Sequence, residues 1–384
     1  DKYIAEKEIS ADLIERIGAE NHFTFTEDWR MGQVENAAKL DKFIQEVKEL
    51  TGSRKVNLYG LSHGGQLTAT YLYYYGAKGD VDRAIMDAPA TCGTQLVVDL
   101  FEGNIHFDVA TLIEYVEIGF RKEYEYEWLV EAFGFDRLNQ AFNDIIHQYL
   151  LDIVINFGSV WDFVPPDKYE EFKAKYLDPV ENAELIAKSD EMHYNAMAHM
   201  SEGLKRAQDA GTKIAIIANT EHDIGTSTGV NSDYIIDVHS ASGAYCAPFG
   251  EKFPADYKKQ NTVCNDPTHR HISPERDIDA SCAYLPENTW FVNGQFHGMC
   301  PWDRYTRNFY LTFFFTDRIT DVYSDPEFPQ FNLGQNPANG LYVKFDKSPS
   351  GFHTSKDTAL TIESLSEQYD TEIISVKADG MDAD

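Results

Sequence analysis

Residues 55–75 read KVNLYGLSHGGQLTATYLYYY, a strand pattern followed by a helix pattern with a serine between them. Residues 55–59 have the pattern of a buried strand, and residues 66–75 have the pattern of a helix. Between them, Ser62 is flanked at a distance of two residues by Gly60 and Gly64. A sharp strand-to-helix turn holds a serine hydroxyl out of the fold, and flanking glycines let strand and helix approach each other. The stretch therefore predicts a nucleophilic serine at position 62.

A second serine, Ser227, has the same glycine spacing, with Gly225 and Gly229 on either side. It lies well past the apolar run at 214–218, and the residues after it, 230–233, have no helical periodicity. A cluster of Gly, Ser and Thr without flanking periodic segments is typical of a loop. We expect Ser227 to be a loop residue and not the nucleophile.

The composition limits the classes of protein and partner. The chain has 384 residues, of which 43% are hydrophobic and 13% aromatic, as in a folded globular protein with two or three structural units. Its 63 acidic and 33 basic residues give a net charge of −30, which makes nucleic acid and anionic membrane surfaces poor partners and favours a neutral or zwitterionic small molecule. No apolar run is long enough to cross a membrane, so we expect a soluble protein of undetermined oligomeric state.

The cysteines bear on localisation. Four of the five cysteines, Cys246, Cys264, Cys282 and Cys300, fall in one stretch, and Cys92 stands apart. This clustering favours disulfides and a secreted, extracellular protein, with buried free thiols as the alternative. Residues 1–4 show no signal-peptide features, but a processed secreted protein would begin in the same way.

Helix and strand patterns alternate over residues 1–100 and return over 212–330, and these two segments are expected to form one core. Such alternation is typical of an α/β fold with a mostly parallel sheet and helices on both faces. The expected helices are 9–17, 40–50 (closed by Gly52) and 66–75; the expected strands are 22–26, 55–59, 83–86, 213–217 and 289–292.

Two segments depart from this alternation. Over residues 101–211 the strand pattern vanishes and aromatic residues recur at helical spacing, which predicts a helical lid, or alternatively an ordinary helical subdomain. Residues 338–384 read as a small β appendage with short strands at 341–345, 359–362 and 372–376.

A serine nucleophile needs a histidine to take its proton and a carboxylate to orient that histidine. In an α/β sheet these residues follow later strands, in the order Ser, Asp, His. His297 directly follows the expected strand at 289–292, between Gly294 and Gly298, and Asp233 follows the strand at 213–217. We therefore predict Ser62, His297 and Asp233 as the catalytic residues, with the backbone N–H of His63 as an oxyanion donor. The alternative acids are Asp223, Asp237 and Asp87.

A further group of residues has the types that bind zinc: Cys264, His269 and His271, with Cys282 beyond. Their spacing matches no common structural zinc pattern, so a polar loop with a disulfide is favoured over a metal site. The nearby Asp266, Asp277 and Asp279 could bind calcium, but the sequence indicates a calcium site as weakly as it indicates a zinc site. We expect no cofactor.

With these motifs in place, the chain resembles the lecithin:cholesterol acyltransferase and bacterial lipase branch of the α/β-hydrolases. The similar segments are 23–25 leading into Asp28-Trp29-Arg30, then 60–64, 87–90 with Gly93-Thr94, 159–165, and 231–236. The 246–288 loop and the β appendage match nothing in the family. The family's first oxyanion donor lies before the Asp-Trp-Arg segment, so we expect a longer natural sequence that contains it.

The resemblance implies a serine esterase or lipase that acts on a small-molecule or lipid acyl ester, with transient contact to a lipid interface. The aromatic insertion would cover the acyl chain, with Trp128, Phe133, Phe142 and Trp161 as lining residues. The alternatives are a lipid acyltransferase with the same triad, a non-catalytic binding protein that retains the fold, and a peptidase. Fold similarity does not decide among them.

Overall fold

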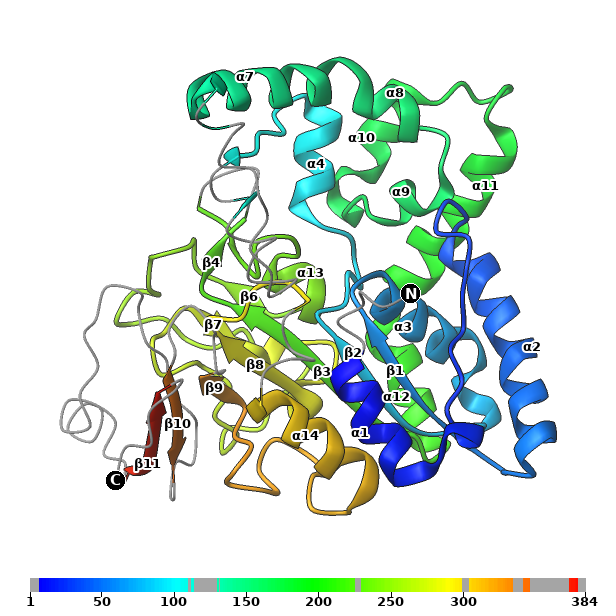
Figure 1. Ribbon diagram of the computed structural model, residues 1–384, viewed down its shortest axis with the longest axis vertical. Coiled ribbons are helices and arrows are strands. Elements are labelled where there is room, and N and C mark those ends of the chain that lie inside the picture. The colour runs from blue at the N-terminus through cyan, green and yellow to red at the C-terminus, as the bar shows by residue number, and fades with distance from the viewer. Residues whose placement is uncertain are drawn as a thin grey trace.

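The computed structural model describes residues 7–109, 112–113, 130, 132–224, 229–298, 304–333, 341–345 and 373–378. Its centre is a five-stranded sheet in the order β1-β2-β3-β8-β9, in which every neighbouring pair is parallel. The fold is therefore α/β with a parallel sheet, as the alternating pattern predicted (Figure 1). The strands are β1 (Val56–Leu61), β2 (Val81–Asp87), β3 (Lys213–Thr220), β8 (Thr289–Asn293) and β9 (Phe331–Leu333).

Helices cover both faces of the sheet because successive side chains of a strand point to opposite sides. Along β3, Ile214 and Ile216 belong to one core cluster, whereas Ala215 and Ile217 belong to another. The first cluster lies under α2 (Gln33–Thr51), α3 (His63–Tyr75) and α12 (Met200–Asp209), and the second lies under α1 (Lys7–Ile17) and α14 (Arg304–Phe315).

Most local predictions for the core are confirmed. The helix expected at 40–50 is part of α2, which ends at Gly52 in the left-handed conformation with φ 69°. A glycine there ends a helix without the steric cost that a Cβ would bring. The helices at 9–17 and 66–75 and the strands at 55–59, 83–86, 213–217 and 289–292 also correspond to observed elements.

The strand expected at 22–26 is wrong. This segment has no strand pairing, and β1 is the edge of the sheet in the described part of the chain. Of its two phenylalanines, Phe23 is exposed, whereas Phe25 packs against the first core cluster, with its ring centroid 5.4 Å from that of Phe43 on α2. Phe25 therefore contacts the core through its side chain, without a strand ladder. Helix α14 and strand β9 were not foreseen.

The segment between β2 and β3 contains no strand among its described residues, and its elements α4 to α11 lie together in the upper part of Figure 1. Its last elements, η4 and α12, pack instead on the first core cluster of the sheet, so the expected helical insertion at 101–211 is partly core. The rest of the insertion has a core of its own, which includes Phe101, Trp161 and Phe172. Trp128 lies outside the described residues. The elements are α4 (Gln95–Glu102), α7 (Phe135–Ile145), η3 (Ile146–Leu150), α8 (Leu151–Val154), α9 (Gly158–Asp162), α10 (Pro166–Tyr176), α11 (Ala183–Glu191) and η4 (Met192–Met197).

Short elements complete the fold. The C-terminal segments β10 (Leu341–Phe345) and β11 (Ile373–Ala378) form an antiparallel pair, and the strand expected at 359–362 lies outside the described residues. The others are η1 (Ala19–Asn21), η2 (Gly76–Lys78), β4 (His222–Asp223), β5 (Asn231–Ser232), α13 (Val238–Ser242), β6 (Tyr245–Cys246), β7 (Ile278–Asp279), η5 (Ala280–Cys282) and η6 (Pro286–Asn288).

The expected disulfides are not found among the described cysteines, since Cys92, Cys246, Cys264 and Cys282 all carry free thiols. Their sulfurs face other groups: the Sγ of Cys264 lies 3.4 Å from the His269 ring, and the Sγ of Cys246 lies 4.0 Å from a backbone carbonyl. Cys300 lies outside the described residues.

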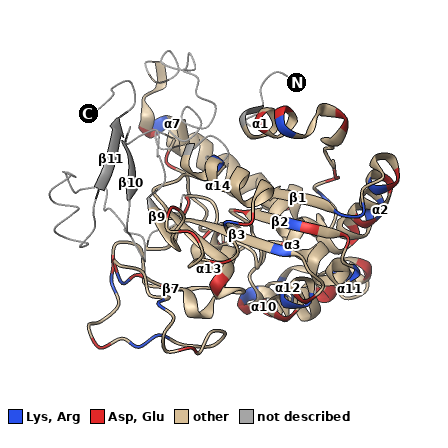
Figure 2. Cartoon of the chain, turned by 90° about the horizontal axis from the view of Figure 1, so that it is seen from below, with Lys and Arg blue, Asp and Glu red and all other residues tan. Residues whose placement is uncertain are grey.

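Many of the charged residues lie on helices at the outside of the molecule. Acidic and basic side chains gather on outward-lying helices such as α1, α2 and α11 (Figure 2). Among the helices that the structure describes, none combines the length and the apolar character needed to span a membrane.

Candidate active site

Ser62 occupies the turn between β1 and α3 with φ 57° and ψ −117°, a conformation that is rare for a residue with a side chain. Three backbone hydrogen bonds hold it there. Its N–H donates to the carbonyl oxygen of Asp87 at 2.9 Å, and its own carbonyl accepts from the N–H groups of Gln66 at 3.0 Å and Ala90 at 3.4 Å. The strained turn projects the hydroxyl of a partly exposed residue away from the sheet.

The glycines around Ser62 are not equally necessary. A Cβ on Gly60 would lie 2.2 Å from the carbonyl oxygen of Gly64, and one on Gly65 would lie 2.7 Å from the Cβ of Pro89. A Cβ on Gly64 would meet nothing within 4 Å. Close approach of strand, helix and the β2 loop therefore requires Gly60 and Gly65, whereas the sequence pattern had singled out Gly60 and Gly64.

His297 and Asp233 converge on Ser62. The Nε2 atom of His297 lies 2.8 Å from the Oγ of Ser62, and its Nδ1 atom lies 2.8 Å from the Oδ2 of Asp233. A carboxylate only accepts hydrogen bonds, so Nδ1 carries the proton and Nε2 presents its lone pair to the serine hydroxyl. The Asp233 side chain is 1% exposed, and its Oδ1 accepts two backbone N–H bonds, from Ile235 and Ile236.

The electrostatics of the pair favour a protonated histidine. Burial disfavours the charged ring and lowers its pKa. The Asp233 carboxylate and its hydrogen bond raise the pKa by more than this, and the Asp87 carboxylate raises it further. The pKa of His297 is therefore raised above its usual value of 6.5. Such a ring can accept a proton from Ser62 and hold it beside Asp233.

The three alternative acids have other partners. The Oδ2 of Asp87 accepts from the hydroxyls of Tyr59 and Tyr310, both at 2.6 Å. Asp237 caps the N-terminus of α13 through the N–H of Ser240 at 2.8 Å and also accepts from the N–H of Gln95. Asp223 accepts from the backbone N–H of Val230. Asp233, by contrast, lies 2.8 Å from the Nδ1 of His297 through its Oδ2.

His63 is the first residue of α3, where a backbone N–H has no partner within its helix. This N–H lies beside the nucleophile, as an oxyanion donor must. Its imidazole is held by the Glu27 carboxylate, with 2.8 Å between Nδ1 and Oε1, and Gln33 donates to its carbonyl oxygen. Neither Glu27 nor Gln33 was expected to be near the site, because no local pattern marks either.

Helix α9 of the insertion contacts the same turn. Gln66, one turn after Ser62, donates from Nε2 to the carbonyl oxygen of Asp162 at 2.7 Å. The Asp162 carboxylate accepts from the N–H of Gln33, at the start of α2, at 2.6 Å. Burial raises the pKa of Asp162 to about 7, against the lowering effect of that bond. The insertion is therefore hydrogen-bonded to the helices on both sides of the nucleophile.

The aromatic residues expected to line an acyl site lie in different environments. Phe133 and Phe142 are 51% and 37% exposed, just before and on α7. Trp161 is fully buried, packs edge-on against Phe101 and donates from Nε1 to the carbonyl oxygen of Ile155. Trp161 would therefore have to become exposed before it could touch a substrate.

Comparisons with known proteins found no match for this chain among family models, curated proteins or solved structures. Ser227, the second serine with glycine spacing, lies outside the described residues.

Proposed function

We propose that the protein is a serine-dependent carboxylic ester hydrolase, an esterase or lipase of the α/β-hydrolase kind. The observation that carries this proposal is the continuous hydrogen-bonded chain from the Ser62 hydroxyl through His297 to Asp233, with both bonds at 2.8 Å. These residues are 235 and 64 positions apart in the sequence. Nucleophile, base and orienting acid in this order are what acyl transfer through a serine requires.

In the proposed reaction, the Oγ of Ser62 attacks the ester carbonyl carbon while the Nε2 of His297 takes the hydroxyl proton. The resulting imidazolium is stabilised by the Asp233 carboxylate, and the oxyanion accepts a hydrogen bond from the His63 N–H. Collapse of the intermediate expels the alcohol, which receives the proton from His297, and leaves an acyl-serine. A water molecule, deprotonated by His297, then releases the carboxylic acid and restores Ser62.

The surface of the insertion supports a lipid ester as the substrate. Apolar side chains recur along one continuous helical segment, α7 through η3 to α8, and remain exposed, which is typical of a surface that contacts lipid or a partner. Phe142, Ile145, Tyr149 and Ile153 follow at spacings of three, four and four residues, so they share one face. We call these four residues the apolar stripe; their exposed fractions are 37%, 61%, 51% and 61%.

A covalent probe tests the proposal on the full-length protein. A fluorophosphonate should label the wild type and should fail to label Ser62→Ala. Ser227→Ala is the matched control, because it removes the other serine with flanking glycines and should be labelled normally. Absence of labelling in the wild type would instead favour the non-catalytic binding protein, and labelling that persists in Ser62→Ala would overturn the assignment of the nucleophile.

The reaction type is then read from products. Hydrolysis of p-nitrophenyl esters of increasing chain length should rise toward longer acyl chains if the stripe faces lipid. Acyl transfer differs only in the acceptor, so transfer to an added lipid alcohol in preference to water would favour the acyltransferase alternative. Turnover of amides as fast as esters would favour the peptidase.

A further inference from the structure

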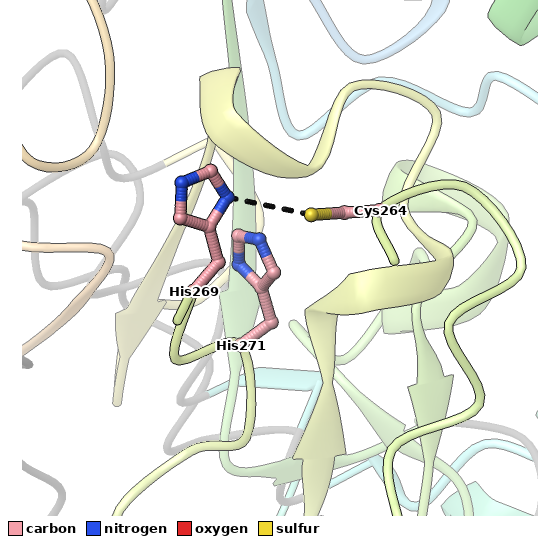
Figure 3. Close-up of side chains that lie close together, drawn as sticks. All are labelled: Cys264, His269 and His271. Atoms are coloured by element: carbon pink, nitrogen blue, oxygen red, sulfur yellow. Dashed lines mark hydrogen bonds between the residues drawn. The ribbon is translucent and has the colours of Figure 1, made fainter. Parts of the chain in front are cut away.

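Three side chains with metal-binding atoms lie together in the loop between β6 and β7, away from the triad. The ligand atoms of Cys264, His269 and His271 all lie within 4.8 Å of one another (Figure 3). The Sγ of Cys264 lies 3.4 Å from the Nδ1 of His269, the contact drawn as a dashed line. One thiol and two imidazoles are a donor set that suits zinc.

Hydrogen bonds fix which nitrogen of His271 is free to bind a metal. Its Nδ1 lies 2.9 Å from the Oε1 of Gln330, whose Nε2 donates to the carbonyl oxygens of Pro286 and Thr289 at 2.7 and 3.0 Å. The two carbonyls determine the orientation of the amide, so an acceptor faces Nδ1 and the ring proton must be there. The lone pair of the fully buried His271 is therefore on Nε2, and the arrangement is the one that metal-ligating histidines use to fix their tautomer.

The backbone around the three residues is also held in place. The N–H of Cys264 donates to the carbonyl oxygen of Ser281 at 3.0 Å, and the carbonyl oxygen of His271 accepts from Ala280 at 2.7 Å. Lys259 donates from Nζ to the carbonyl oxygen of His269 at 2.8 Å. The backbones of Cys264 and His271 are thus bonded to η5, and that of His269 to Lys259 of the same loop, by bonds that do not use the ligand side chains.

The distances require little movement to receive an ion. In a tetrahedral site with a Zn–S bond of about 2.3 Å and a Zn–N bond of about 2.0 Å, sulfur and nitrogen lie about 3.5 Å apart and two nitrogens about 3.3 Å apart. The observed 3.4 Å between Cys264 and His269 is close to the first value, and the 4.8 Å limit for the group leaves at most about 1.5 Å to close. The Nε2 of His271 now faces the Tyr323 hydroxyl at 3.5 Å, a long contact that an ion would replace.

A carboxylate completes the set. The Oε1 of Glu287 lies 3.0 Å from the Nδ1 of His269, the same atom that faces Cys264. A thiolate and a carboxylate would balance the two positive charges of the ion. We propose that Cys264, His269 and His271 bind a zinc ion, with Glu287 as the fourth ligand.

The position of the site indicates its role. Glu287 precedes β8 and Gln330 precedes β9, so the ion would join the loop to the amino ends of two core strands. His297 follows the opposite end of β8, about 16 Å away for a five-residue strand. The zinc is therefore structural: it stabilises the fold and takes no part in ester chemistry.

Metal content and stability test this inference, which is independent of the proposed reaction. Full-length protein, reduced and then dialysed with zinc, should retain one zinc per chain, and zinc should raise its melting temperature. Cys264→Ser and His271→Ala should lose both effects. Cys282→Ser is the matched control, because it removes a partly buried thiol beside the loop but outside the cluster, and it should bind zinc as the wild type does. Retention of zinc by Cys264→Ser would overturn the proposal.

Two measurements on the wild type avoid any dependence on variant folding. Cobalt in place of zinc should show a near-ultraviolet thiolate-to-cobalt charge-transfer band. Zinc should also protect Cys264 from iodoacetamide, as mapped by peptide mass, while Cys246 and Cys282 react at the same rate with or without it. A cobalt complex that lacks the band, or equal labelling of Cys264 in both states, would count against the site.

Discussion

His297 is bonded to Asp233 twice: its backbone N–H donates to the Asp233 carbonyl oxygen at 2.8 Å, and its Nδ1 faces the Asp233 carboxylate at 2.8 Å. The backbone bond holds the two loops together whatever the side chain at 233 is. The carboxylate is therefore free to set the tautomer and charge of the ring. The backbone bond fixes the position of the loops and the carboxylate sets the charge of the ring. Replacing the Asp233 carboxylate by an amide therefore tests its electrostatic role without moving the loops.

Asp233→Asn should lower kcat by about 10⁴-fold with little loss of stability, because an amide offers Nδ1 a donor and stabilises the wrong tautomer of His297. Esterase kinetics and thermal denaturation measure the two effects. Asp237→Asn, which alters the cap of α13, is the control: it should leave kcat nearly unchanged and cost at most about 1 kcal/mol. Near-normal turnover in Asp233→Asn together with lost turnover in Asp87→Asn would move the acid to Asp87.

The pH dependence follows from the raised pKa of His297. The base must be neutral to accept the serine proton, so kcat/KM should fall as the pH drops through a value above 6.5. The same shift has the opposite sign for folding: the stability that it contributes is present below the unfolded pKa and is lost as the pH rises through the folded one. In Asp233→Asn the acid limb of residual activity should move to lower pH. A wild-type limb well below 6.5 would contradict this.

The glycines of the turn should respond in opposite ways. Gly60→Ala should destabilise the protein by about 3 kcal/mol or more, because its Cβ would meet a backbone oxygen that cannot move. Gly64→Ala, which enters open space on a helix, should be neutral or stabilising by up to about 1 kcal/mol. Urea denaturation compares them directly, and equal losses in both variants would show that the packing described around Gly60 is incorrect.

The apolar stripe should matter only for aggregated substrate. The double variant Ile145→Ser/Ile153→Ser should reduce hydrolysis of an emulsified long-chain ester several-fold and leave kcat for a soluble short-chain ester unchanged, since neither residue belongs to the triad. Val180→Ser, which alters an 83% exposed side chain elsewhere on the insertion, is the control. An equal loss on both substrates would mean that the stripe supports the fold and not an interface.

The sequence alone determined the local structural elements, because these depend on residues that are close together in the chain. The Ser62 turn, the helices around it and most strands of the parallel sheet follow from periodicity and glycine placement within about 20 residues. The local pattern failed where a distant partner is needed: residues 22–26 alternate like a strand, but they pair with no strand, and Phe25 packs against Phe43 on α2 instead.

The tertiary structure decided which distant groups meet. Four carboxylates were candidates for the acid, and only packing of the loop after β3 against the loop after β8 brought Asp233 to His297. The spacing of Cys264, His269 and His271 in the sequence matches no common zinc pattern. Glu287, the proposed fourth ligand, and Gln330, which orients His271, come from segments that precede other strands. Residues of a site built from separate loops have no regular spacing in the sequence, because they come together only when the strands pair into the sheet.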